Sequence, residues 1–160
     1  MYDFKPADPA DKTALYTELA AAISAITDGE PDQVANMANC AALMGEFLPD
    51  LNWAGFYRVV DAQLVLGPFI GRPACIRIPM GKGVCGTAAA EARSVLVEDV
   101  HAFPGHITCD AASRSELVVP IIKNGAVVAI IDLDSPNPAR FDETDQTGVE
   151  RIAGILSERF

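Results

Sequence analysis

Positive charge is scarce in this sequence of 160 residues. Twelve Lys and Arg residues stand against 22 Asp and Glu residues, which gives a net charge of −10. A protein that binds nucleic acid neutralises the phosphates with a basic surface, and anionic membranes attract basic segments in the same way. The charge balance therefore argues against both partners, and we expect no nucleic acid and no membrane.

Long apolar runs are also absent, since none reaches the length of about 18 residues that a membrane-spanning helix needs. The first twelve residues are polar and lack the basic start and apolar core of a signal peptide. We therefore expect a cytoplasmic protein. No repeat, linker or block of like charge divides the chain. Because this length suits one compact unit, we expect a single domain over residues 1–160.

Hydrophobic periodicity predicts helices at both ends of the chain and strands in the middle. Helical spacing of apolar residues predicts helices over residues 8–26, 32–48, 84–92 and from Asp142 onward. Runs rich in β-branched and aromatic residues predict strands at residues 53–60, 64–70, 76–79, 94–100, 117–122 and 127–133. Asn124-Gly125 between the last two runs is a strong hairpin signal. This order predicts an α+β fold, with a mainly antiparallel central sheet and helices on its faces.

The chain has only four cysteines, and a reducing cytoplasm does not favour a disulfide framework. Cys40 lies within a predicted helix among Ala, Met and Leu, so we interpret it as a small buried hydrophobe. Cys85 follows a glycine-rich loop at a predicted helix N-terminus, where free N–H groups and the helix dipole stabilise a thiolate. Cys75 lies beside a loop. Cys109 lies in a polar loop, where packing into an apolar core does not explain the presence of a thiol. These last three are candidate redox thiols.

Metal binding is the alternative use of these thiols. The possible ligands are His101, His106, Cys75, Cys85 and Cys109. Zinc ligands usually come in pairs two to four residues apart, whereas the intervals between the three cysteines are 10 and 24 residues. We therefore expect no metal and no other cofactor.

Three carboxylates form a second candidate site. Asp132 and Asp134 lie two residues apart at the end of a predicted strand, so both point to the same face. Counting back from the Asn124-Gly125 turn places Glu116 opposite Leu133, beside this pair. Carboxylates held this close repel each other unless a cation lies between them.

Three cations can fill that position, and the residues alone leave the choice open. Arg114 is close in sequence to Glu116 and would make the cluster a purely structural feature. The ammonium group of a ligand or a divalent metal would make it a binding site.

Four segments resemble those of a known family. They are Asn52–Tyr57 (NWAGFY), Gly81–Ala88 (GKGVCGTA), His106–Glu116 (HITCDAASRSE) and Ile131–Pro136 (IDLDSP). Together with the intervals between the three cysteines, they resemble the free methionine-(R)-sulfoxide reductases, which are single GAF domains. The resemblance covers residues 19–156, and a generic GAF sensor has no reason to combine this cysteine triad with the carboxylates. It implies a GAF-like version of the predicted fold.

The resemblance implies that the chain reduces free L-methionine (R)-sulfoxide to L-methionine. Cys109 matches the thiol that attacks the sulfoxide sulfur, Cys75 the main resolving thiol, and Cys85 an additional or alternative one. The sulfenic acid that forms on the attacking thiol condenses with a second thiol to an intramolecular disulfide. A soluble dithiol such as thioredoxin would then reduce that disulfide by exchange. The family also implies a homodimer.

The resemblance also gives roles to the acids and to the one tryptophan. Glu116, Asp132 and Asp134 match the acids that hold the substrate ammonium and assist proton transfer. Trp53, which its strand context alone would assign to the core, matches the pocket wall against the substrate methyl group. Each charge-assisted bond to an ammonium is worth roughly 1.5–3 kcal/mol, and a methionine sulfoxide inside a protein has no such group.

Two other functions remain as alternatives from the sequence. A GAF module that binds a small molecule without turnover would need the acidic pocket but not the thiols. A zinc-dependent or structural thiol protein is the other alternative, and near-stoichiometric zinc in the reduced, purified protein would favour it. The reductase function uses both sets of residues.

Overall fold

The computed structural model describes residues 4–160; the expected domain of residues 1–160 also includes residues 1–3, which lie outside the described part. The helices are α1 (Lys12–Ile26), α2 (Gln33–Phe47), α3 (Gly83–Glu91) and α4 (Glu143–Ser157), with a 3-10 turn at Val100–Ala102. The strands are β1 (Trp53–Val60), β2 (Gln63–Gly71), β3 (Arg77–Pro79), β4 (Val95–Val97), β5 (Ser115–Lys123) and β6 (Ala126–Ser135). None of the helices within residues 4–160 could span a membrane.

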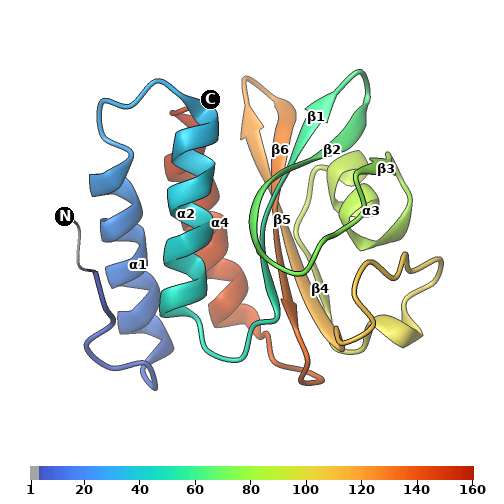
Figure 1. Cartoon of the computed structure of the whole chain (residues 1–160), viewed down its shortest axis with the longest axis horizontal. Helices are drawn as coiled ribbons and strands as arrows, with labels where there is room; N and C mark the ends of the chain where they lie inside the picture. The colour runs from blue at the N-terminus through green and yellow to red at the C-terminus, as the bar shows by residue number, and fades with distance from the viewer. Residues whose placement is uncertain (1–3) are drawn as a thin grey trace.

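The strands form one antiparallel sheet in the order β3-β2-β1-β6-β5-β4. Figure 1 shows α1, α2 and α4 together on one face of this sheet, while α3 and the long connections lie on the other. The prediction of an α+β fold with a mainly antiparallel central sheet is therefore confirmed. The two faces have different roles, since one holds the main core and the other holds the polar cluster described below.

Aspartate side chains begin the three long helices. Asp11 accepts a hydrogen bond from the N–H of the third residue after it, and Asp32 does the same for α2. Asp142 forms a capping box with Asp145 at the start of α4. These side chains satisfy N–H groups that the first helical turn leaves without partners. The predicted start of the first helix near Asp8 is wrong, because the capping aspartate is Asp11.

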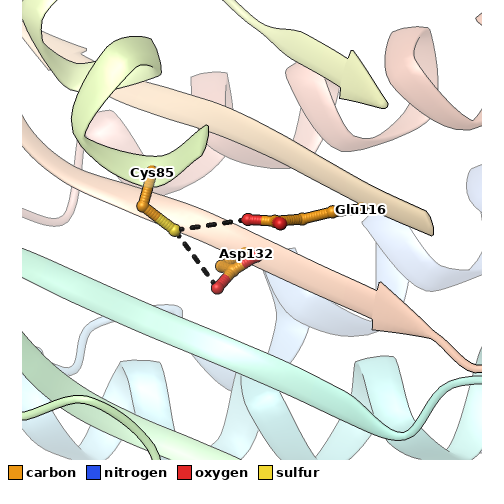
Figure 2. Close-up of side chains that lie close together, drawn as sticks. All are labelled: Cys85, Glu116 and Asp132. Atoms are coloured by element: carbon orange, nitrogen blue, oxygen red, sulfur yellow. Dashed lines mark hydrogen bonds between the residues drawn. The ribbon is translucent and has the colours of Figure 1, made fainter. Parts of the chain in front are cut away.

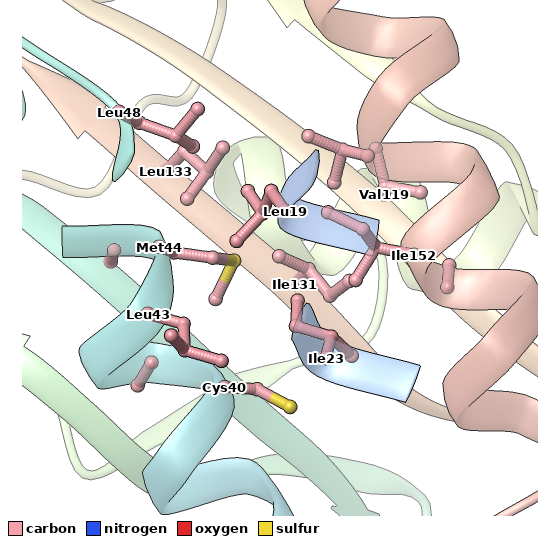
Figure 3. Packing of buried hydrophobic residues seen from close by; sticks show 14 of the residues in the cluster. Leu19, Ile23, Cys40, Leu43, Met44, Leu48, Val119, Ile131, Leu133 and Ile152 are labelled. Carbon is pink, nitrogen blue, oxygen red and sulfur yellow. The ribbon is translucent and has the colours of Figure 1, made fainter. Parts of the chain in front are cut away.

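The main core lies between the sheet and the three long helices. Alternate residues of β5, such as Val119, and of β6, such as Ile131, point into it and meet α1, α2 and α4. Figure 3 shows Cys40 among these side chains. Its thiol is fully buried, and burial raises its pKa to about 12. The interpretation of Cys40 as a small buried hydrophobe is therefore confirmed.

A β-bulge changes the predicted register of the β5–β6 hairpin. Next to the turn, Ile122 pairs with Val127 as expected, but Ile121 pairs with Ala129, so Val128 is an additional residue in β6. A bulge of this kind shifts every later pair by one residue. Glu116 consequently lies opposite Asp134 and not opposite position 133.

Two glycines of α4 provide a matched test of this packing. A Cβ at Gly148 would overlap the ring of Tyr16, whereas one at Gly154 would meet nothing within 4 Å. We expect Gly148→Ala to destabilise the protein by about 1–3 kcal/mol through overpacking. Gly154→Ala should stabilise it by about 0.5–1 kcal/mol, because alanine favours the helix. Thermal unfolding of both variants measures the difference, and equal shifts would contradict the close approach of α1 and α4.

Candidate active site

Pairing across three strands places the acids in neighbouring rows on one face of the sheet. In one row Trp53 of β1 pairs with Asp134 of β6, which pairs with Glu116 of β5. In the next row on this face, Asp132 pairs with Val118 of β5. Directly paired residues share a face, so the bulge decides where Glu116 points. With the register predicted from the sequence, Glu116 would have paired with a core-facing residue and left the cluster.

Helix α3 adds a thiol to the three carboxylates. Cys85, in its first turn, is buried, and its Sγ donates to Asp132 Oδ2 at 3.3 Å and to Glu116 Oε1 at 3.6 Å (Figure 2). Each of these three residues offers one atom that could bind a metal ion, and these atoms lie within 4.8 Å of one another. Asp132 Oδ1 is buried and has no hydrogen-bond partner among the described residues. The cluster therefore has an unused acceptor.

Burial and mutual repulsion keep protons on these acids. Burial is the largest cause and the neighbouring carboxylates the next, and together they raise the pKa of Glu116 and of Asp134 well above their usual values. Burial also raises the pKa of Asp132 from 3.8 to about 7, although hydrogen bonds from Cys85 and Glu116 oppose the shift. Carboxylic acids with raised pKa are available as proton donors at neutral pH.

The same surroundings contradict the prediction that the helix N-terminus makes Cys85 a thiolate. Burial, followed by the charges of Asp132 and Glu116, raises the pKa of this thiol well above 9.0. A helix dipole contributes about half a charge at its end, which does not offset burial and two carboxylates at hydrogen-bond distance. Cys85 is therefore held as a protonated thiol.

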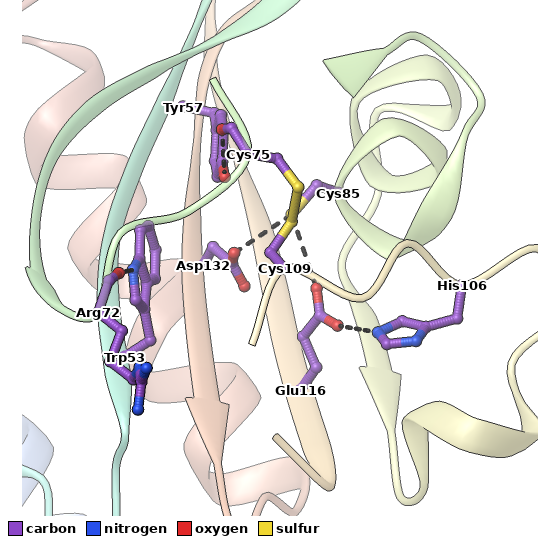
Figure 4. Close-up of a disulfide and its surroundings, with 9 residues drawn as sticks. All are labelled: Trp53, Tyr57, Arg72, Cys75, Cys85, His106, Cys109, Glu116 and Asp132. Atoms are coloured by element: carbon purple, nitrogen blue, oxygen red, sulfur yellow. Dashed lines mark hydrogen bonds and ion pairs between the residues drawn. A yellow bond between two sulfur atoms is a disulfide. The ribbon is translucent and has the colours of Figure 1, made fainter. Parts of the chain in front are cut away.

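The other two candidate thiols form a disulfide. Cys75, between β2 and β3, is bonded to Cys109 with a Cα–Cα distance of 5.5 Å. Figure 4 shows this bond beside Cys85 and above the acids. The backbone of Cys75 is fixed because its carbonyl accepts a hydrogen bond from Tyr57 Oη at 3.0 Å. Cys109 lies in the irregular segment between the 3-10 turn and β5.

These groups surround one pocket. Cys85, Cys109, Glu116, Asp132 and Asp134 all contribute to its wall. Cys75 does not line it directly but is bonded to a residue that does.

Trp53 belongs to both the core and the pocket wall. Its side chain is only 2% exposed, its ring stacks on Phe69 at 5.2 Å, and its Nε1 donates to the carbonyl of Arg72 at 3.2 Å. It also lines the pocket beside its strand partner Asp134. The ring is thus a rigid apolar surface next to the acids.

Several residues of the site had no individual role in the prediction. His106, considered only as a metal ligand, places Nε2 3.9 Å from Glu116 Oε2. Asn52 Nδ2 donates to Asp110 Oδ2 at 3.1 Å and to Ser113 Oγ at 3.0 Å. These bonds tie the segment around Cys109 to the start of β1. His106 and Asn52 both lie in motifs that resemble the family, and this membership could have identified them as residues of the site.

Arg114 does not neutralise the acid cluster, so the structural explanation of the cluster is wrong. Its guanidinium pairs with Asp99 at 3.6 Å, and it does not line the pocket. The five-residue metal set is not assembled either, because His101 pairs with Asp99 and the sulfurs of Cys75 and Cys109 are bonded to each other.

Known proteins match this chain over most of its length. The GAF domain family model matches residues 34–158. The free methionine-R-sulfoxide reductase of Escherichia coli K12 is 45% identical over 148 residues, which are 92% of this chain and 90% of that protein. The chain belongs to the free methionine-R-sulfoxide reductases of the GAF fold. The yeast enzyme of the same name, from Saccharomyces cerevisiae, is 38% identical over 92% of this chain and 87% of its own.

Solved structures of this reductase family have the same fold. The enzyme of Neisseria meningitidis in complex with its substrate is 44% identical, has a TM-score of 0.93, and covers 100% of this chain and 95% of its own. The reduced form of the Staphylococcus aureus enzyme is also 44% identical, with a TM-score of 0.87 over 90% of this chain and 94% of its own. The resemblance stated from the motifs is therefore confirmed.

The raised pKa of Asp132 predicts a pH-dependent gain of stability in Asp132→Asn. The folded protein keeps this proton at pH values where the unfolded chain has lost it, so wild-type stability falls as pH rises from about 4 to 7. The amide avoids that loss and should add about 1–3 kcal/mol at pH 8, or about 3–10 °C in Tm. Thermal unfolding at pH 8 and pH 4.5 measures it, with exposed Asp61→Asn as control. A gain that is equal at both pH values would contradict the assignment.

Proposed function

We propose that this chain reduces free L-methionine (R)-sulfoxide to L-methionine and becomes oxidised to the Cys75–Cys109 disulfide. The observation that carries the proposal is this disulfide at a pocket lined by three buried acids and a tryptophan. The substrate named for the Escherichia coli enzyme and the substrate complex of the Neisseria meningitidis enzyme support it. A binding module without turnover would need the acids but would have no use for the adjacent thiols.

The acid cluster is suited to hold the substrate ammonium. An ammonium has three donors and one positive charge, and Asp132 Oδ1 is a buried acceptor without a partner among residues 4–160. Glu116, Asp132 and Asp134 would share this cation, which relieves their repulsion. Each such bond is worth roughly 1.5–3 kcal/mol. The face of Trp53 would then lie against the methyl group.

The reaction proceeds through a sulfenic acid. Cys109 Sγ attacks the sulfoxide sulfur while a carboxylic acid, Glu116 or Asp134, donates a proton to the oxygen. This attack joins the two sulfurs and leaves the protonated oxygen on the substrate sulfur as a hydroxyl group. The hydroxyl group then moves to Cys109 Sγ as its bond to the substrate sulfur and the bond between the two sulfurs break. Methionine leaves with two more electrons on its sulfur, and Cys109 is left as a sulfenic acid. The thiol of Cys75 then attacks that sulfur and expels water, which gives the disulfide.

Two observations support Cys109 as the attacking thiol. Cys85 is surrounded by carboxylates that raise its pKa, so it is a poor nucleophile. Cys109 lines the pocket, whereas Cys75 does not. We therefore give Cys75 the resolving role and Cys85 an additional one, as a thiol that can exchange into the disulfide.

The remaining proposals concern the surroundings of the enzyme. We propose that a dithiol of the thioredoxin type reduces the disulfide, in the reducing cytoplasm. A homodimer is proposed from the family, and sedimentation of the purified chain tests it. No metal or other cofactor enters the chemistry, because the thiols supply both electrons.

Removal of the attacking thiol tests the function directly. Purified enzyme is incubated with both epimers of free methionine sulfoxide and dithiothreitol, and the epimers are then separated. We expect loss of the R epimer only, and at least a 10³-fold lower rate for Cys109→Ser, because no other thiol replaces the nucleophile. Cys40→Ala, which removes a thiol far from the pocket, should keep the wild-type rate. Wild-type turnover in Cys109→Ser would show that another thiol attacks.

Replacement of Glu116 tests the acid cluster. Glu116→Gln removes one partner of the ammonium and one proton donor, so kcat/KM should fall about 10²-fold. Wild-type kcat should fall as pH rises through the raised pKa of the donor, because the ionised form has no proton to give. Rates between pH 5 and 9 with dithiothreitol measure both effects, with Glu46→Gln on the far face as control. An unchanged kcat and KM would remove Glu116 from the site.

A further inference from the structure

The segment around Cys75 is positively charged, although the protein as a whole is acidic. Residues 62–90 contain Arg72, Arg77 and Lys82 but no Asp or Glu, in a chain with a net charge of −10. All three cations are exposed. Within residues 4–160, no carboxylate forms an ion pair with any of them. An otherwise acidic protein thus presents three exposed cations in the segment that contains one of its redox sulfurs, and the charge of one of them, Arg72, also lowers the pKa of Asp110.

An exposed apolar side chain lies in the same segment, next to Arg77 in the sequence. Ile76, next to Cys75, is 70% exposed, more than any other large apolar residue in the described part of the chain. Its position is fixed, because its carbonyl accepts a hydrogen bond from the N–H of Leu66 at 2.9 Å. Arg77 follows it in β3, the edge strand of the sheet. An exposed apolar residue with a charged rim is the usual composition of a protein contact.

The two sulfurs of the disulfide differ in their neighbours. Cys75 lies between Arg72 and Arg77, on a backbone held by Tyr57. Cys109 is followed directly by Asp110. An acidic partner is therefore attracted to the segment that contains Cys75, whereas the acidic neighbour of Cys109 is partly offset by Arg72 of that same segment.

We propose that Ile76 and Arg77, with Arg72 and Lys82 at the rim, form the docking surface for an acidic protein dithiol that attacks Cys75. This inference rests on the proposed function, in which such a dithiol must reduce the enzyme after each turnover. The occupant is a protein with an exposed thiol, apolar contact surface and negative charge beside it. It differs from a small reductant such as dithiothreitol, which needs no surface.

The exchange balances as two thiol–disulfide steps. A thiolate of the partner attacks Cys75 Sγ, the bond between the two sulfurs breaks, and Cys109 leaves as a thiolate that takes a proton from solvent. The partner is then joined to Cys75 by a mixed disulfide. The second thiol of the partner then attacks the partner's sulfur in the mixed disulfide, which forms a disulfide within the partner and releases Cys75 as a thiol. The partner loses two electrons, and the attacking thiol Cys109 is restored in the first step.

The test measures reduction of the disulfide without any sulfoxide. The full chain is oxidised, excess oxidant is removed, and the rate of reduction is followed with thioredoxin or with dithiothreitol as the probe. We expect the double variant Ile76→Ser/Arg77→Glu to react at least tenfold more slowly with thioredoxin and within twofold of wild type with dithiothreitol. The wild-type rate with thioredoxin should fall as salt rises, since charge steers the encounter.

Matched controls lie on the helical face of the molecule. Val34 is 54% exposed on α2 and Arg151 is exposed on α4, so Val34→Ser/Arg151→Glu makes the same chemical changes elsewhere. We expect the control to keep the wild-type rate with both reductants. The proposal is overturned if thioredoxin reduces the double variant at the wild-type rate, if the control slows equally, or if both reductants slow together.

A trapping experiment tests which sulfur is attacked. Thioredoxin with its second cysteine replaced by serine stops at the mixed disulfide, and peptide mass spectrometry locates the bond. A bond to Cys75 is expected, and a bond to Cys109 would contradict the docking geometry. Neither assay contains methionine sulfoxide, so a negative result would refute the docking surface alone. The assay that separates the sulfoxide epimers tests the proposed function.

Discussion

Three carboxylates buried on one face of the sheet are the constraint on which the site depends. Among residues 4–160, His106 is the only basic side chain within 4.0 Å of any of them, and burial lowers its own pKa. Burying unpaired charge is costly, so the acids respond by holding protons. The cluster has two consequences for function, since it attracts a cation and it keeps a proton ready for transfer. Both properties come from the absence of a neutralising arginine or lysine.

The thiols are arranged around this constraint. Cys85 is so close to the acids that its thiolate is suppressed, whereas the Cys75–Cys109 pair lies beside the acids with Cys109 in the pocket wall. Redox chemistry and recognition of the ammonium thus occupy adjacent positions. A hydrogen bond from Tyr57 of β1 holds the carbonyl of Cys75, and one from Asn52, directly before β1, holds Asp110 next to Cys109. The strand that contributes Trp53 therefore also positions the disulfide.

Most of the fold could be predicted from the sequence because its signals are local. Alternating apolar residues and the Asn124-Gly125 turn identified the hairpin, and apolar spacing identified the helices. The register could not be predicted, because the bulge at Val128 has no sequence signal such as a glycine. This single residue decides whether Glu116 faces the site or the core. The start of the first helix was also wrong, since two aspartates competed for the capping position.

The residues of the site could be predicted from the sequence, but their protonation and ion pairs could not. Motifs identified the residues of the pocket, but the protonation of Cys85 and the pairing of Arg114 depend on tertiary distances that no local pattern contains. The thiolate argument counted one helix end and not the carboxylates that β5 and β6 bring to the same sulfur. The surface around Ile76 is a further example, because its exposure follows from the edge position of β3.

Titration of the three carboxyl groups tests the central claim most directly. Carbon-13 NMR of the side-chain carboxyl carbons of Glu116, Asp132 and Asp134, assigned with single Gln or Asn variants, reports each proton between pH 4 and 9. The account predicts that these carbons titrate well above the ordinary range near 4, and that free methionine shifts the transitions downward as its ammonium enters the cluster. Three ordinary transitions near pH 4, unchanged by methionine, would contradict it.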